Sequence, residues 1–191
     1  MLRVARRLAL VMVVLSASCA EPPNKEMNQA QGALDAARAA GAGTYAAAEF
    51  KAAEDALRKS EEAVAAGDYR QALNHALDSR ERAQTSAKMA VDGRAEARAQ
   101  AERAITEVAT LLSRAQTELK DPDVIRGARD LKSPRATVTK VEAMLQGARK
   151  ALASENYGAV ATTLNGAAAQ LQAALNELDG AVAPKTAPRK R

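Results

Sequence analysis

Small apolar residues recur at helical spacing along most of the chain, with charged and amide residues between them. The clearest case lies between residues 69 and 120, where such residues return every seven positions. One series is Tyr69, Ala76, Ala83, Ala90, Ala97, Ala104 and Leu111, and a second is Leu73, Ala87, Ala101, Val108 and Ala115, interrupted by Arg80 and Arg94. A seven-residue repeat predicts helices packed as in a coiled coil, and alanine at these positions predicts close helix spacing.

Capping and breaking residues divide this pattern into about five helices, over residues 25–40, 45–66, 69–120, 134–153 and 157–181. The predicted caps and turns are Asn24, Thr44, Gly67-Asp68, Ser133-Pro134 and Asn156. Asp121-Pro122 should end the long third helix, and 121–133 is predicted to be a connector with some local helix. A break of the third helix at Asp92-Gly93 is the main structural alternative.

A weak internal repeat links two of these boundaries. Gly67-Asp68-Tyr69 and Glu155-Asn156-Tyr157 are 88 residues apart, and in each a helix is predicted to end before the triplet and another to begin at the tyrosine. We interpret the repeat as two related helical hairpins, because its period is too long for stacked short repeats.

Composition supports an all-α fold. Alanine is the strongest helix former, but it buries little apolar area, and aromatic residues make up only 2% of the chain. Stability must therefore come from long, close helix contacts rather than from a large core. We predict an elongated, alanine-rich antiparallel bundle of coiled-coil hairpins, with N-terminal hairpins over 25–120 and a C-terminal hairpin over 134–182.

The first 18 residues are typical of an export signal. A basic segment precedes a short apolar run, 8–15, which is too short to span a membrane, and small residues follow it. The only cysteine, Cys19, comes next. Residues 19–24 are then predicted to be an extended tether.

The segment Ser16-Ala17-Ser18-Cys19 resembles the lipobox of bacterial lipoproteins, with Ser16 in place of the usual leucine. The resemblance implies that Cys19 carries several acyl chains. Several chains anchor a protein stably in a membrane, whereas a single chain binds only weakly and reversibly. Ala20, rather than an acidic residue, directly follows the cysteine, which in such lipoproteins implies passage to the outer membrane; an inner-membrane location is the alternative. The alternative is cleavage after Ala20, which would release a soluble periplasmic protein.

A second resemblance covers residues 39–90. This segment is similar to an uncharacterised domain family of bacterial envelope lipoproteins. The matching residues are Tyr45, Ala46, Ala53, Ala56, Leu57, Gly67, Asp68, Tyr69 and Ala72. The family resemblance implies an all-helical envelope protein and no known reaction. The same segment also resembles half of a tetratricopeptide unit, but without the tryptophan, the proline and the 34-residue period.

The net charge of +5 comes from the two ends of the chain. Seven of the 28 basic residues lie there, and the remaining 21 are set against 23 acidic residues, so the body carries about −2. A near-neutral body with few aromatics argues against nucleic-acid binding. The tail, 183–191, is predicted to be disordered. Its basic residues Lys185, Arg189, Lys190 and Arg191 either contact an anionic membrane or wall polymer or are only solvated.

No residues of the chain form a recognisable catalytic, cofactor or metal site. His75 is the only histidine, and a zinc site needs three or four ligands. The carboxylates Glu61, Glu62, Asp78 and Glu81 are interpreted as a solvated face, with Asp78 paired to Arg82 four residues on. Tyr45, Tyr69 and Tyr157 each open a helix, where they either cover the end of a seam or form an aromatic patch for a partner.

These observations favour a non-enzymatic envelope lipoprotein that acts as a helical spacer or docking scaffold. The membrane is its first predicted partner, through Cys19. Others are an envelope or cell-wall component and a second copy of the chain, which the alanine seams and Leu111, Leu112 and Leu119 could contact. The alternatives are a soluble periplasmic protein that holds apolar cargo between helices, and an envelope enzyme.

Overall fold

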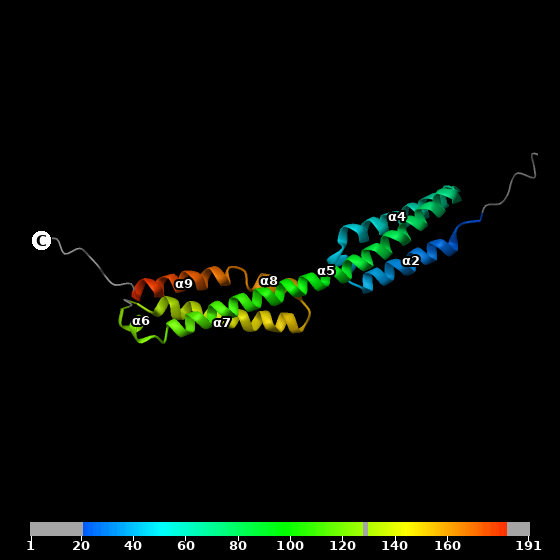
Figure 1. The fold of residues 1–191 in the computed structure, drawn as a ribbon. Coiled ribbons are helices and arrows are strands. Elements are labelled where there is room, and N and C mark those ends of the chain that lie inside the picture. Colours follow the sequence, from blue (N-terminus) through cyan, green and yellow to red (C-terminus); the bar gives the residue numbers. More distant parts are fainter. Residues whose placement is uncertain (1–20, 128–129, 183–191) are drawn as a thin grey trace, which may run out of the picture. The chain divides into compact units, whose positions relative to one another are not determined.

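The computed structural model describes residues 21–127 and 130–182, and α-helix is the regular structure of this part of the chain. Within it lie five helices of 16 to 50 residues, joined in places by shorter ones (Figure 1). They are α2 (Asn24–Ala39), α4 (Ala47–Ala65), α5 (Tyr69–Glu118), α7 (Lys132–Ala153) and α9 (Ala167–Val182), with the short α3 (Ala42–Tyr45), α6 (Pro122–Gly127) and α8 (Tyr157–Thr163). The all-α prediction is confirmed.

The chain forms two compact units, Met1–Arg94 and Ala95–Arg191. The first unit contains α2, α3, α4 and the first part of α5, and the second contains the rest of α5 and the helices after it. Helix α5 runs without interruption through Asp92 and Gly93, so the alternative of a break there is wrong.

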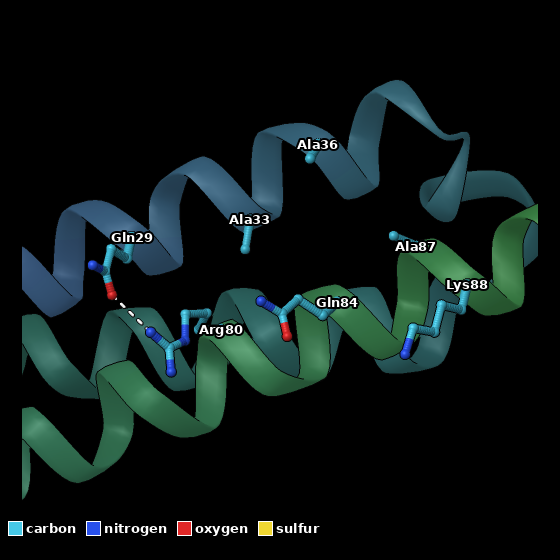
Figure 2. A pocket seen from close by; sticks show the side chains of 7 residues that line it. All are labelled: Gln29, Ala33, Ala36, Arg80, Gln84, Ala87 and Lys88. Carbon is cyan, nitrogen blue, oxygen red and sulfur yellow. Dashed lines mark hydrogen bonds between the residues drawn. The ribbon is translucent and has the colours of Figure 1, made fainter.

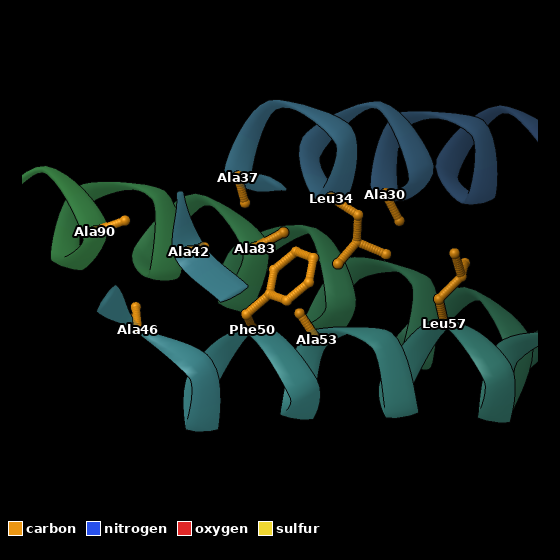
Figure 3. Packing of buried hydrophobic residues seen from close by; sticks show 10 residues of the cluster. All are labelled: Ala30, Leu34, Ala37, Ala42, Ala46, Phe50, Ala53, Leu57, Ala83 and Ala90. Atoms are coloured by element: carbon orange, nitrogen blue, oxygen red, sulfur yellow. The ribbon is translucent and has the colours of Figure 1, made fainter. Parts of the chain in front are cut away.

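The core of the first unit is made mostly of alanines around a few larger residues. Phe50 and Leu57 of α4 point toward α2, whose Leu34 points back at them (Figure 3). Helix α5 adds only alanines to this cluster, at Ala83 and Ala90, and both are fully buried. The second unit has larger buried side chains, among them Leu171, Leu175, Leu178, Val141 and Val160.

The two junctions of the internal repeat have the same geometry. Gly67 and Glu155 both adopt the left-handed conformation, with φ of 75° and 57°. In each, the next residue donates its backbone N–H to a helix carbonyl five residues back, at 2.9 Å. The side chains of Asp68 and Asn156 then cap the following helix, accepting from the N–H of the third residue on, at 2.9 and 3.2 Å.

Three of the predicted caps were wrong. Helix α2 already includes Asn24, whose side chain makes no capping bond, and Thr44 lies inside α3. Helix α4 instead begins after Ala46, which has no side chain able to cap. Ser133 lies inside α7, because Asp130 accepts from the N–H of Lys132 at 2.8 Å and starts the helix earlier.

The fifth predicted helix, 157–181, is in fact two helices. Helix α8 ends at Thr163, and Gly166 adopts a φ of +72° before α9 begins. A residue with positive φ cannot continue a right-handed helix, so the chain turns here. The turn places Leu164 and Ala167 in buried positions on either side of the break.

Candidate docking surfaces

Two buried serines join α4 and α5, and a third, Ser86, donates to the carbonyl of Ala83 within α5 at 2.9 Å. Ser60, Ser79 and Ser86 are fully buried. The hydroxyl of Ser60 donates to the backbone carbonyl of Ala72 at 2.7 Å, and that of Ser79 donates to the carbonyl of Ala53 at 2.8 Å. A serine side chain is short, so these bonds between helices require their backbones to lie close together. The predicted tight packing is confirmed in this seam.

The seam uses a different set of positions from those that the sequence predicted. The series Ala76, Ala83 and Ala90 is fully buried, as expected. Its partner series is Ala72, Ser79 and Ser86, three and four residues away, whereas Leu73 and Ala87 are only half-buried. The sequence reasoning missed these serines because it counted serine as polar. Their regular seven-residue spacing was the available clue.

A groove of about 650 Å³ lies between α2 and α5 in the first unit (Figure 2). Its floor is formed by Ala33, Ala36 and Ala87, and its rim by Gln29, Arg80, Gln84 and Lys88. The guanidinium of Arg80 donates to the side-chain oxygen of Gln29 at 2.7 Å across one end. Arg80 and Gln84 place polar side chains at the edge of this groove. The rim includes two cations and no acidic residue.

Two shallow hollows of about 720 and 600 Å³ lie along α5 in the second unit, and the larger is also bounded by Arg149 of α7. They meet at Thr106. Small residues such as Ala99, Thr110 and Thr117 form their floor, and longer side chains such as Glu102 and Arg114 form their edges. This surface is a grooved helix face rather than an enclosed cavity.

The leucines predicted to contact a partner are used within the second unit. Leu112 is buried, and Leu111 and Leu119 are half-buried. Ala101, Val108 and Ala115 are buried as well, and they form the inner side of this part of α5. These positions are therefore not free for a partner.

Ion pairs account for several of the candidate carboxylates. Asp78 pairs with Arg82 at 2.9 Å, as predicted, and Glu49 of α4 lies 3.1 Å from the same guanidinium. The hydrogen bond and charge of Asp78, with the charge of Glu49, raise the pKa of Arg82. Glu62 pairs with Arg58. The Arg58 pair is exposed and the two Arg82 pairs are partly buried; all lie on helix surfaces.

The tyrosines favour the seam-covering interpretation over the aromatic patch. Tyr157 is buried, and Tyr45 and Tyr69 are half-buried. Tyr45 packs against the core cluster of the first unit, and its backbone approaches Gly93 of α5.

Other predicted site residues do not gather into a centre. His75 is half-buried on α5. The described residues contain no group of three or more histidine, cysteine and acidic side chains that could hold a metal ion. Among the helices of residues 21–127 and 130–182, none has the length and hydropathy to cross a bilayer. Cys19 and the tail residues Lys185, Arg189, Lys190 and Arg191 lie outside the described residues, so both assignments stay predictions.

No family model, curated protein or solved structure matches the chain. The resemblances to the lipobox and to the envelope domain family therefore stay predictions from the residues that carry them.

Proposed function

We propose that the chain is a non-enzymatic scaffold of the bacterial envelope, held to a membrane through a lipid on Cys19. The observation that carries the proposal is that the helix seam inside the first unit is tightly closed, whereas the outer helix faces carry open grooves. The seam of the first unit is closed by backbone-bonded serines, while open grooves of small residues lie on its outer helix faces and on those of the second unit. Such surfaces suit contact with another macromolecule.

The position of the first helix also fits a unit anchored at a membrane. Helix α2 begins at Asn24, five residues after Cys19. A five-residue segment spans at most about 18 Å. A lipid on Cys19 would therefore hold the first unit close to the membrane surface.

Metabolic labelling with a palmitate analogue tests the anchor. The intact chain should be labelled and should sediment with membranes, whereas Cys19→Ala should lose the label and appear in the soluble fraction. Glu21→Ala, two residues away, is the matched control and should keep the label. Label retained on Cys19→Ala, or unprocessed chain beginning at Met1 in the cytosol, would refute the proposal.

A second candidate function is suggested by the groove between α2 and α5. Its apolar floor with Arg80 and Lys88 at the rim fits a soluble protein that holds anionic apolar cargo. Anilinonaphthalene sulfonate, an anionic apolar dye, is a suitable probe. Ala33→Leu should fill the groove and reduce dye fluorescence, whereas Ala136→Leu on the exposed side of α7 should not. Equal fluorescence in both variants would exclude this groove as the binding site.

A further inference from the structure

The turn between α8 and α9 differs from the other left-handed turns of the described chain in the residue that precedes it. Gly166 adopts a φ of +72°, and Asn165 comes directly before it. The other described residues with positive φ follow alanine or serine; they are Gly41, Gly67 and Glu155. Asn165 is also the only one of the six asparagines that is followed by glycine.

The hydrogen bonds of this turn bypass the N–H of Gly166. The N–H of Asn165 donates to the carbonyl of Thr162 at 3.4 Å, and the N–H of Ala167 donates to the carbonyl of Leu164 at 3.0 Å. Within residues 21–127 and 130–182, neither the N–H of Gly166 nor the side chain of Asn165 makes a hydrogen bond. Both residues are exposed. The side-chain amide and the neighbouring backbone nitrogen are therefore open to solvent and held by no bond.

An asparagine followed by glycine can cyclise without a catalyst. The backbone nitrogen of Gly166 loses its proton and attacks the side-chain carbonyl carbon of Asn165. A C–N bond forms, the bond to the side-chain nitrogen breaks, and ammonia leaves. Glycine favours this attack because it has no side chain to block it and its backbone rotates freely.

Water then opens the cyclic imide at either of its two C–N bonds. Cleavage of the bond to the former side-chain carbonyl gives aspartate. Cleavage of the original peptide bond gives isoaspartate, in which the main chain passes through the side chain of the residue and gains a methylene group.

We propose that Asn165 is a site of spontaneous deamidation in the folded protein, and that its isoaspartate form loosens α9. The longer main chain lies between Leu164 and Ala167, which are buried on either side of the turn. Because a protein interior is close-packed, both residues cannot keep their places when the turn lengthens. Helix α9 follows directly, and its Leu171, Leu175 and Leu178 form much of the buried core of the second unit.

The aspartate product should not loosen the helix. It leaves the length of the main chain unchanged, and its charge lies next to the first turn of α9, which begins at Ala167. A helix N-terminus stabilises a nearby anion through its free N–H groups. Asn165→Asp therefore separates the effect of the charge from the effect of the altered main chain.

Ageing of the folded chain tests the modification. The full chain carrying Cys19→Ser, so that neither lipid nor native thiol contributes, would be incubated and digested, and its peptides analysed by mass spectrometry with electron-transfer fragmentation, which distinguishes isoaspartate from aspartate. We expect both products at Asn165 while the other five asparagines stay intact. Asn165→Gln should stay unmodified, since glutamine would have to close a larger ring. Asn74→Gln, at an exposed position of α5, is the matched control and should convert at Asn165 as before.

Urea distinguishes conversion in the folded turn from conversion in an opened chain. Below the unfolding transition the rate at Asn165 should not change with urea, and it should approach the rate in a synthetic peptide of residues 161–171. A rate that rises with urea in this range would assign the reaction to the opened chain and overturn the proposal. So would an Asn165 that stays intact in the folded chain while the peptide converts.

Hydrogen exchange tests the effect on α9. The isoaspartate form, separated by chromatography, should exchange its α9 amides faster than the unmodified chain, because the helix opens more often. Asn165→Asp should exchange like the unmodified chain. Unchanged α9 exchange in the isoaspartate form would refute the loosening, and equally fast exchange in Asn165→Asp would refute its assignment to the main chain.

Discussion

At the scale of single residues, the size of the side chain sets how closely the helices of the first unit pack. Ser79 is fully buried, and its hydroxyl spans the gap between α5 and the carbonyl of Ala53 at 2.8 Å. The gap therefore has space for a hydroxyl and little more. Serine contributes here both by its volume and by its hydrogen bond, so these two contributions can be separated by substitution.

We expect Ser79→Ala to lower the free energy of unfolding by about 1 kcal/mol, because one buried hydrogen bond is lost. Ser79→Val should cost more, about 2 kcal/mol, because its added methyl groups force the helices apart. Urea denaturation measures both values. Thr85→Val on the exposed side of the same helix is the control and should be close to neutral. Equal costs for the two Ser79 variants would show that the seam can open.

Two glycines should respond to the same substitution in opposite directions. Gly67 has a φ of +75°, whereas Gly32 lies within α2, and a Cβ at either position would have no atom within 4 Å. Backbone preference alone therefore decides each result. Gly67→Ala should destabilise the chain by about 1 kcal/mol, and Gly32→Ala should stabilise it by about 0.5–1 kcal/mol. Thermal unfolding followed by circular dichroism can measure both; a stabilising Gly67→Ala would refute the assignment of this turn.

At the scale of elements, the sequence predicts helices well where the end is set by local chemistry. Gly67-Asp68 and Asn156 behave as predicted because a left-handed residue and a capping side chain act within a few residues. The division of α8 from α9 was missed although Asn165-Gly166 is a dipeptide typical of turns, because the apolar pattern continues across it. The sequence could not decide whether α5 continues past Gly93, because glycine weakens a helix locally. The reason for a glycine at this position is its contact with Tyr45, which is distant in sequence.

Gly93 lies where the backbone of α5 approaches the backbone of Tyr45. A Cβ there would meet the carbonyl oxygen of Tyr45 at 3.1 Å and its Cβ at 3.2 Å. We therefore expect Gly93→Ala not to give the stabilisation predicted for Gly32→Ala, because the helical gain is offset by crowding. Gly93→Leu should be clearly destabilising, by about 2 kcal/mol. Urea denaturation of the three variants makes the comparison; a stabilising Gly93→Ala would mean that the Tyr45 backbone yields freely.

At the scale of the whole molecule, the two units repeat one pattern with different side chains. At the repeat offset of 88 residues, buried Ala53, Ala72, Ala83 and Ala90 correspond to buried Val141, Val160, Leu171 and Leu178. The sequence revealed this relation at the turn and its nearest flanks, where Leu57 matches Leu145, and not along the whole seam, because alanine and leucine seams look unlike each other when aligned residue by residue.

This difference in side chains should give the two units different local stability. A fully buried leucine contributes about 2 kcal/mol more than a buried alanine, at about 0.8 kcal/mol for each added methylene. Two leucine-for-alanine and two smaller valine-for-alanine differences favour the second unit, and the first unit offsets them in part with Phe50 and Leu34. Segments with fewer buried apolar groups open at lower free energy, so amides of α2 and α4 should exchange before those of α7 and α9.

Native-state hydrogen exchange in rising urea, followed by mass spectrometry, resolves the two sets of amides. Leu171→Ala should remove much of the difference, lowering the opening free energy of α9 by about 2–5 kcal/mol. Leu77→Ala is the matched control, because that side chain is 39% exposed and its loss leaves no cavity. If α4 and α9 instead open together at one free energy in every variant, stability is shared along α5, and the alanine seam is as cohesive as the leucine core.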